Sequence, residues 1–217
     1  MPENYLDGFK GYLQSDGYEG YSHIGKSPGV THVGCLAHIR RKFVEATIVK
    51  KKSGAAHEAI ARIGKIYQKE KELRELDVPA SEFLERRREA IAPMLEDFSF
   101  WLSSKKEVAP SSLLGKAVGY ALSQWEKLSR FLDHKGLIPD NNISERAVRP
   151  FVVGRKNWQF CDSPRGAYAS ANFYSLIETA KLNGIEPYAY LRHVLSGCIM
   201  AETEDGWRKL LPQNYPG

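Results

Sequence analysis

The chain has 217 residues, 42% of them apolar, a composition typical of a globular protein that excludes an intrinsically disordered chain. Its 31 basic and 26 acidic side chains give a net charge of +5, which weakly favours a polyanionic partner. No apolar run of about 18 residues is present, so no membrane span is expected. The start, MPENYLDGFK, lacks the apolar core of a signal peptide, and three widely spaced cysteines favour a reducing, cytoplasmic location.

The first part of the chain predicts two short strands and then a helical block. FKGYLQSD, residues 9–16, and THVGCLA, residues 31–37, have strand character. A helix is expected from near His38 to the basic run 50–52. From there to Gly136, apolar residues at helix spacing predict three further helices. Candidate N-caps are Ser81 and Ser111 or Ser112, and Pro93 is expected to bend or break the middle helix.

Beyond residue 139 the pattern becomes mixed. PDNNISERAVRP predicts a helix that Asp140 caps and Pro150 ends or bends. FVVGRKNWQF, residues 151–160, is expected to form two short extended pieces. Helices are predicted over 167–183 and from Pro187, followed by a surface tail. The predicted fold class is α/β and helix-rich, with the helical block as an insertion within one α/β domain.

Asp16 ends the first predicted strand and is followed by Gly17. A strand holds its backbone rigidly, and glycine allows a tight turn, so this carboxylate can project from the carboxyl edge of a sheet as a metal ligand. Asp-Gly is also a common turn dipeptide. The local sequence leaves both interpretations open.

Glu145 lies in the helix predicted after residue 139. With Asn141, Asn142 and Arg149 it forms one polar stripe, because residues three and four apart share a helix face. The alternative is a surface pair between Glu145 and Arg149, which would stabilise the helix by a few tenths of a kcal/mol. The pattern alone favours the surface pair.

Cys35 and His38 have the C-x-x-H spacing of some metal sites. A structural zinc ion needs four ligands, and no second close pair is present in the sequence. We therefore favour a buried cysteine and a histidine at the start of a helix over a zinc site.

A basic cluster with interleaved aromatic residues follows Glu145. Basic side chains neutralise phosphates, and aromatic faces stack on bases, so the cluster is a candidate DNA-binding surface. The alternative is solvated surface charge around buried aromatic rings. The residues are Arg146, Arg149, Arg155, Lys156, Trp158, Phe160 and Arg165.

Four segments together resemble a known family. They are GYLQSDGYEGY, GCLAHIRRKF, the long segment from LLGKAVGYALSQWEKLSRFL to IPDNNISERAVRPFVVGRKNWQF, and YSLIETAKLNGIEPYAYL. They resemble the C-terminal half of transposases of insertion-sequence family sixty-six, bacterial enzymes of the DDE type. The similarity runs from about Tyr5 to Leu211, and the DNNISERAVRPFVVGRKNW block is highly specific.

The resemblance implies a ribonuclease-H-like catalytic core over 1–52 and 137–197. It implies an all-α insertion over 53–136 and a tail over 198–217. Asp16 would be the second aspartate of the triad and Glu145 its glutamate, both ligands of Mg²⁺ or Mn²⁺. Cys35 and His38 would have a supporting role near the site.

The sequence departs from the family pattern at the first triad aspartate, which lies several dozen residues before the position of Asp16. Asp7 is too close to Asp16 to replace it. We therefore expect a truncated catalytic core, a C-terminal fragment with little or no activity alone. Expected partners are DNA in the nucleoid of a bacterial cytoplasm, and a second copy or a full-length transposase. The alternative is a non-catalytic remnant that binds DNA or pairs with a transposase.

Overall fold

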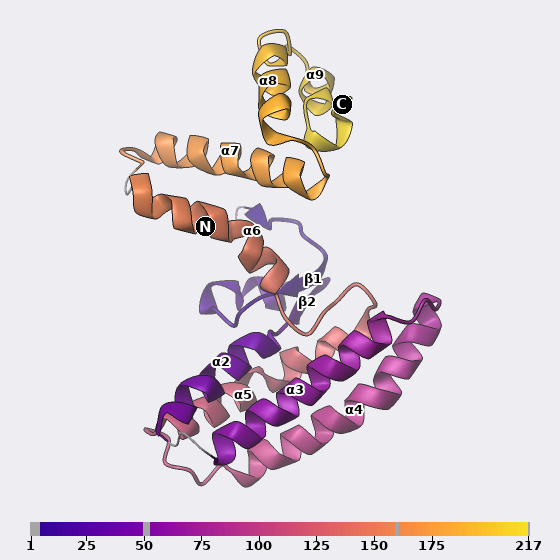
Figure 1. Cartoon of the computed structure of the whole chain (residues 1–217), viewed down its shortest axis with the longest axis vertical. Helices are drawn as coiled ribbons and strands as arrows, with labels where there is room; N and C mark the ends of the chain where they lie inside the picture. Colours follow the sequence, from indigo (N-terminus) through magenta and orange to yellow (C-terminus); the bar gives the residue numbers. More distant parts are fainter. Residues whose placement is uncertain (1–4, 50–52, 159–160, 217) are drawn as a thin grey trace. The chain divides into compact units, whose positions relative to one another are not determined.

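The computed structural model describes residues 5–49, 53–158 and 161–216, with the backbone alone for residues 49 and 158. Helices dominate the described chain (Figure 1). Contacts divide it into two compact units, residues 1–142 and 143–217. The strands are β1 (Gly11–Gln14) and β2 (Val30–Val33), and the α-helices are α2 (Leu36–Ala46), α3 (Ala55–Arg74), α4 (Ala80–Ser104), α5 (Leu113–Ser129), α6 (Asn142–Trp158), α7 (Pro164–Leu182), α8 (Pro187–Gly197) and α9 (Glu204–Lys209).

The two strands pair in parallel, with Gly11 opposite Val30 and Gln14 opposite Val33. Both are shorter than the sequence predicts. Two 3-10 turns, η1 (Glu19–Tyr21) and η2 (Ile24–Lys26), lie in the connection between them. The helix-rich α/β class is confirmed, whereas the ribonuclease-H-like fold stays a prediction, because the described residues form a sheet of two strands.

Helices α2 to α5 share one apolar core in the first unit (Figure 1). At its centre the rings of Phe43, Phe98, Trp101 and Trp125 pack with centroids 5.6–6.3 Å apart. Large aromatic side chains dominate core energetics, so this cluster fixes α2 against α4 and α5. The core is therefore continuous from α2 into the predicted insertion, whose boundaries at 53 and 136 stay predictions.

Several predicted boundaries in this block are corrected. Helix α2 ends at Ala46, well before the basic run 50–52, which lies outside the described residues. Helix α4 begins directly after Pro79, so Ser81 is not its cap. Pro93 does not break α4, because buried residues on both sides of it, Ile91 and Leu95, keep the helix packed on the core.

Ser112 is confirmed as the cap of α5. Its Oγ accepts the Gly115 amide at 3.0 Å, which satisfies one of the free N–H groups of the first turn. The helix gives way at Arg130 to the 3-10 turn η4 (Arg130–Asp133), so it ends before the predicted stop at Gly136.

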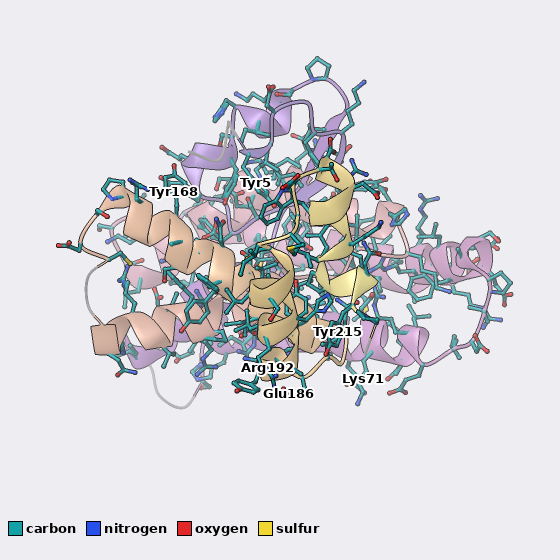
Figure 2. The ribbon with its side chains drawn as sticks, turned by 90° about the horizontal axis from the view of Figure 1, so that it is seen from above. Tyr5, Lys71, Tyr168, Glu186, Arg192 and Tyr215 are labelled. Carbon is teal, nitrogen blue, oxygen red and sulfur yellow. The ribbon has the colours of Figure 1, made fainter. Side chains whose placement is uncertain are left out.

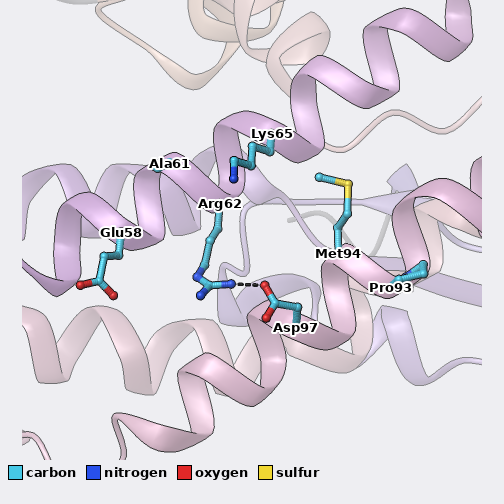
Figure 3. Close-up of a pocket in the computed structure, with 7 residues that line it drawn as sticks. All are labelled: Glu58, Ala61, Arg62, Lys65, Pro93, Met94 and Asp97. Atoms are coloured by element: carbon cyan, nitrogen blue, oxygen red, sulfur yellow. Dashed lines mark hydrogen bonds and ion pairs between the residues drawn. The ribbon is translucent and has the colours of Figure 1, made fainter.

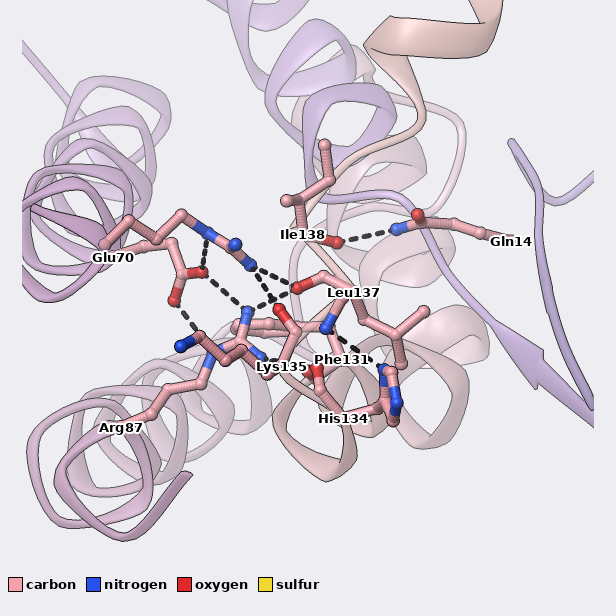
Figure 4. A network of polar contacts seen from close by, with 10 residues as sticks. Gln14, Glu70, Arg87, Phe131, His134, Lys135, Leu137 and Ile138 are labelled. Carbon is pink, nitrogen blue, oxygen red and sulfur yellow. Dashed lines mark hydrogen bonds and ion pairs between the residues drawn. The ribbon is translucent and has the colours of Figure 1, made fainter. Parts of the chain in front are cut away.

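A buried ion pair joins the helices to the chain that leaves them (Figure 4). Arg87 of α4 is fully buried and donates to both carboxylate oxygens of Glu70 at 2.6 and 2.8 Å. It also donates to the carbonyls of Phe131, His134 and Leu137 at 2.7–3.0 Å. Five such bonds satisfy the whole guanidinium, which is the condition for a buried charge to be tolerated.

The second unit corrects the prediction for residues 151–160. Instead of two extended pieces, α6 is one helix from Asn142 to Trp158, and Phe160 lies outside the described residues. Pro150 lies inside α6, whose axis changes direction partway along (Figure 1). The ring of Phe151 contacts Tyr174 of α7 at 5.3 Å, so α6 and α7 pack as a hairpin. This packing outweighs the strand propensity of the local Phe-Val-Val sequence.

The last helices pack around two tyrosines. The Tyr190 hydroxyl of α8 donates to the Leu210 carbonyl at 2.8 Å, and its ring meets Tyr215 at a centroid distance of 5.7 Å. Figure 2 shows Tyr215, Glu186 and Arg192 near one another in the C-terminal part of the chain. Glu186 accepts the amides of Tyr188 and Ala189, which lower the pKa of its carboxyl and cap α8. The predicted tail contains α9.

Among the described helices, none combines the length and the apolar character needed to cross a membrane.

Candidate active site

Asp16 follows the carboxyl end of β1 by two residues. Its Oδ1 accepts the Tyr18 amide at 3.0 Å, and Gly17 between them has a φ of +84°, a conformation that L side chains rarely adopt. The turn that the sequence predicts at Asp-Gly is therefore present. It places the half-buried Asp16 beyond the end of the strand.

Helix α5 holds this turn from behind. The Tyr120 hydroxyl donates to the Asp16 carbonyl at 2.6 Å. A side chain at Gly17 would lie 2.9 Å from that hydroxyl and 3.1 Å from the Gln124 amide oxygen. Burial, and then the Asp16 charge, raise the pKa of Tyr120, so its hydroxyl keeps its proton and remains a donor at neutral pH.

A buried pair supports the turn from β2. His32 Nε2 and Ser15 Oγ lie 2.7 Å apart, and Ser15 Oγ also accepts the Gly17 amide at 3.4 Å. Burial first, and then the charges of Lys127 and Arg130, lower the pKa of His32, which favours the neutral ring. The sequence pattern did not predict this pair. An available signal was that Ser15 directly precedes Asp16 and that His32 lies inside a predicted strand.

The approach to α6 is tied to the same strands. Gln14 donates to the carbonyls of Ile138 at 2.8 Å and Gly34 at 3.3 Å (Figure 4). The Leu36 amide donates to the Pro139 carbonyl at 2.8 Å. Asp140, predicted as a cap, accepts the Asn142 amide at 3.0 Å. The last residues of the first unit, 138–142, are therefore anchored to it.

Cys35 and His38 are in contact, with Sγ and Nδ1 3.2 Å apart. Burial raises the pKa of the Cys35 thiol, which disfavours the thiolate that a zinc site requires. The other ring nitrogen of His38 lies 3.1 Å from the Arg41 guanidinium. These contacts make Cys35 a buried anchor for the start of α2; the supporting role of both residues stays a prediction.

Glu145 lies in the first turn of α6 and is half-buried. Asn142 and Arg149 share its helix face, as predicted, but Asn141 precedes the helix. Glu145 belongs to the second unit and Asp16 to the first. The meeting of the two acids at one cation therefore stays a prediction.

The predicted basic cluster lies on two helices. Arg146, Arg149 and Lys156 recur at helix spacing along one side of α6 and are exposed. Arg155 is also exposed but lies about 180° around the helix from Arg146. Arg165 lies in the first turn of α7. The Trp158 side chain lies outside the described residues, so its predicted contact with DNA stays a prediction.

Within the described ranges, no three His, Cys, Asp or Glu side chains lie close enough together to hold a metal ion. The donor set at the turn nevertheless fits a hard cation. Asp16 offers a carboxylate, and Gln124 Oε1 beside Gly17 is buried and lacks a hydrogen-bond partner in the described structure. Oxygen ligands of this kind suit Mg²⁺, which also keeps several waters.

A surface groove lies apart from this site, between α3 and α4 (Figure 3). Arg62 forms an ion pair with Asp97 across it, and Glu58 and Lys65 also line it. Two acids and two bases line the groove, so it has no bias toward an anionic or a cationic ligand.

Two family profiles match the chain. The profile described as Transposase IS66 family matches residues 1–169, and the one described as IS66 C-terminal element matches residues 175–213. No solved structure matches the chain.

Relatives in one organism, Sinorhizobium fredii, are similar over most of the chain. The uncharacterized protein y4hP is 34% identical over 211 residues, which are 90% of this chain and 38% of y4hP. The uncharacterized protein y4jD is 35% identical over 83% of this chain and 35% of its own length. The chain thus spans little more than a third of these relatives. The profile match covers well over half of the chain, which therefore belongs to the IS66 family of transposases.

Proposed function

We propose that this chain is the C-terminal part of a DDE-type transposase core, in which Asp16 and Glu145 act as ligands of a divalent metal. Membership of the IS66 family supports this proposal. The geometry of Asp16 supports it too: a carboxylate on a glycine turn beyond a parallel strand, with its backbone held by Tyr120 and Ser15. A ribonuclease-H-like arrangement around these two strands is part of the proposal.

When bound, Mg²⁺ or Mn²⁺ would supply Lewis-acid stabilisation of the phosphate undergoing cleavage and strand transfer. The chain's own part is to offer carboxylate oxygens. Asp16 offers them from a fixed turn, and Glu145 from the first turn of α6. Two carboxylates are one fewer than the DDE triad, so we propose that the first aspartate is missing here. We expect weak metal binding and little or no DNA cleavage by this chain alone.

The metal assignment is tested by Mn²⁺ binding, followed by electron paramagnetic resonance. We expect weak binding that Asp16→Asn and Glu145→Gln each reduce. Asp7→Asn is the matched control, because Asp7 is exposed and precedes the same strand. Equal binding by the wild type and by both site variants would refute the assignment.

Catalysis is tested by nicking and strand-transfer assays with Mg²⁺ or Mn²⁺. The expected result is little or no turnover by the 217-residue chain. Robust turnover that Glu145→Gln abolishes would show that two acids suffice and that the argument for a missing third carboxylate is wrong.

We further propose that DNA binds along the basic side of α6. Arg146, Arg149 and Lys156 are exposed at helix spacing and can follow one phosphate backbone. Arg155 and Arg165, and Trp158 if it stacks on a base, would extend the surface around the helix end. The proposal implies a protein that acts on DNA in the bacterial cytoplasm.

Salt dependence tests this surface. Affinity for duplex DNA is expected to fall steeply between about 50 and 200 mM salt, because each phosphate contact contributes about −0.9 to the log–log slope. Lys156→Ala should flatten that slope by about 1 unit. Arg155→Ala is the matched comparison, and a duplex lying along one side of α6 predicts a smaller change. Binding that does not weaken with salt would exclude phosphate contacts as its basis.

A non-catalytic role in pairing with a second copy or with a full-length transposase is the second candidate. The second unit exposes Ile143, Val152 and Val153 on α6 to about half or more, and exposed apolar surface of this kind marks interaction sites. Light scattering across a concentration series tests it: a strictly monomeric mass excludes pairing between copies, and pull-down of a full-length transposase tests the other pairing.

A further inference from the structure

Tyr18 presents an exposed aromatic ring directly beside the candidate metal ligand. Its side chain is 63% exposed, and its amide is the group that donates to Asp16 Oδ1 at 3.0 Å. A single turn through Gly17 therefore sets the spacing between the ring and the carboxylate. That hydrogen bond fixes the Tyr18 backbone, from which the ring projects, next to Asp16.

The ring is also held in place. It contacts Tyr21 nearly at a right angle, with centroids 6.1 Å apart and an interplanar angle of 79°. It lies over Gly20, where an added Cβ would come within 2.3 Å of the ring edge. A large apolar face that is exposed and nevertheless fixed costs little conformational entropy when a flat ligand stacks on it.

From this geometry we infer that Tyr18 is a stacking platform for an unpaired nucleobase next to the phosphate that Asp16 would face. The inference rests on the proposed function, since it takes DNA as the ligand. Every base has a π-face, so stacking on tyrosine is tolerant of sequence. A base left unpaired where a strand is cut or joined offers such a face, whereas the paired bases of a blunt duplex do not.

The neighbouring charges separate this role from phosphate binding. Tyr18 is flanked by the acids Asp16 and Glu19, and Glu19 is exposed. This loop therefore offers a ring face without cations to replace counterions. Losing the ring should lower affinity for unpaired bases and leave the salt dependence of binding unchanged, whereas losing a basic residue of α6 should reduce that dependence.

The test uses the full chain in Mg²⁺ buffer with two probes of equal length, a single-stranded oligothymidine and a blunt duplex. Fluorescence anisotropy measures the affinity at several salt concentrations. Tyr18→Ala is expected to weaken binding of the single strand by about 5- to 150-fold, the range for loss of one stacked base. Tyr18→Phe, which keeps the ring, should bind like the wild type, and the duplex affinity should not change.

Phe100→Ala is the matched control, because Phe100 is an aromatic residue 78% exposed on α4, away from the strand ends. Unchanged single-strand affinity in Tyr18→Ala, with salt-dependent binding retained, would overturn the stacking role and leave the proposed DNA binding intact. An equal loss for single strand and duplex would also overturn it. Absence of binding to either probe at low salt would overturn both proposals.

Discussion

The two units of the chain differ greatly in how many of their side chains are buried. Residues 1–142 enclose a continuous apolar core and bury a complete ion pair within it. In residues 143–217, the described side chains below a tenth exposed are few, chiefly Ala180 and Tyr190. Much of the apolar surface in this second unit is exposed, including Leu182, Ile199 and Met200 at 76–81%.

This difference shows which part can be stable by itself. The first unit has the continuous core that an independent domain requires, and its buried Arg87 is fully hydrogen-bonded. The second unit depends on caps, short helix contacts and two tyrosines, and its exposed apolar faces remain available to a partner. The two candidate acids belong to different units. Asp16 lies on a turn that the well-packed first unit supports, whereas Glu145 lies on a helix of the less buried second unit.

The largest effect is expected from Glu70→Gln in the first unit. Removing this carboxylate leaves the guanidinium of Arg87 buried without its counter-charge, which costs about 3–5 kcal/mol of unfolding free energy. Urea unfolding followed by circular dichroism measures it. Glu75→Gln is the matched control at the C-cap of the same helix, because Glu75 pairs with the exposed Lys71 and its loss should cost well under about 1 kcal/mol. Equal effects of both changes would contradict a stabilising role for the buried pair.

The next effect is expected in the second unit. Tyr190→Phe removes the donor to the Leu210 carbonyl and should destabilise that unit by about 1–2 kcal/mol. Hydrogen exchange of the α8 amides measures the loss, with Tyr188→Phe as control because Tyr188 is exposed on the same helix. Matching loss of protection in α3 and α4 would show that the two units unfold together.

Two equivalent helix caps give a sharper comparison. Ser112 accepts the Gly115 amide and Ser163 accepts the Gly166 amide, at 3.0 and 3.1 Å. Ser112→Ala and Ser163→Ala should each cost about 1 kcal/mol, the first in α5 and the second in α7. Hydrogen exchange resolved by segment distinguishes them. If either substitution lowered the hydrogen-exchange protection of both helices, the result would argue against separate units.

The smallest effect concerns pH and His32. Because its folded-state pKa lies below its usual 6.5, the unfolded chain binds the proton more readily. The stabilising contribution is therefore complete above about pH 6.5 and is lost as pH falls through the lowered folded-state value. Urea midpoints at pH 7.5 and 5.5 measure it. His32→Gln should reduce this dependence, and an unchanged dependence would assign it to other groups.

The sequence predicted the helices of the core well, because their apolar faces repeat at helix spacing over long windows. The secondary-structure predictions were wrong at positions where packing overrides the local preference of the residues. Phe151, Val152 and Val153 favour strand locally but lie in α6, since their helix packs on α7 through the Phe151–Tyr174 contact. Pro93 lies within an unbroken α4, because the core holds the helix on both sides.

The candidate site shows the same division. Asp16 and its glycine turn could be read from two adjacent residues, because a positive φ at Gly17 is a local property. The contacts of Tyr120 and His32 with this turn could not be predicted in the same way. Tyr120 is 104 residues away from Asp16 in the sequence, and His32 contacts Ser15 from the paired strand.

The sequence by itself determined the family, the helical periodicity and the Asp-Gly turn, because each is written in residues near one another in the chain or in a specific motif. Only the tertiary structure decided that Arg87 is buried against Glu70 and that Tyr120 holds Asp16. Such contacts join residues far apart in the chain, and their energies depend on burial and hydrogen-bond geometry, which no local pattern encodes.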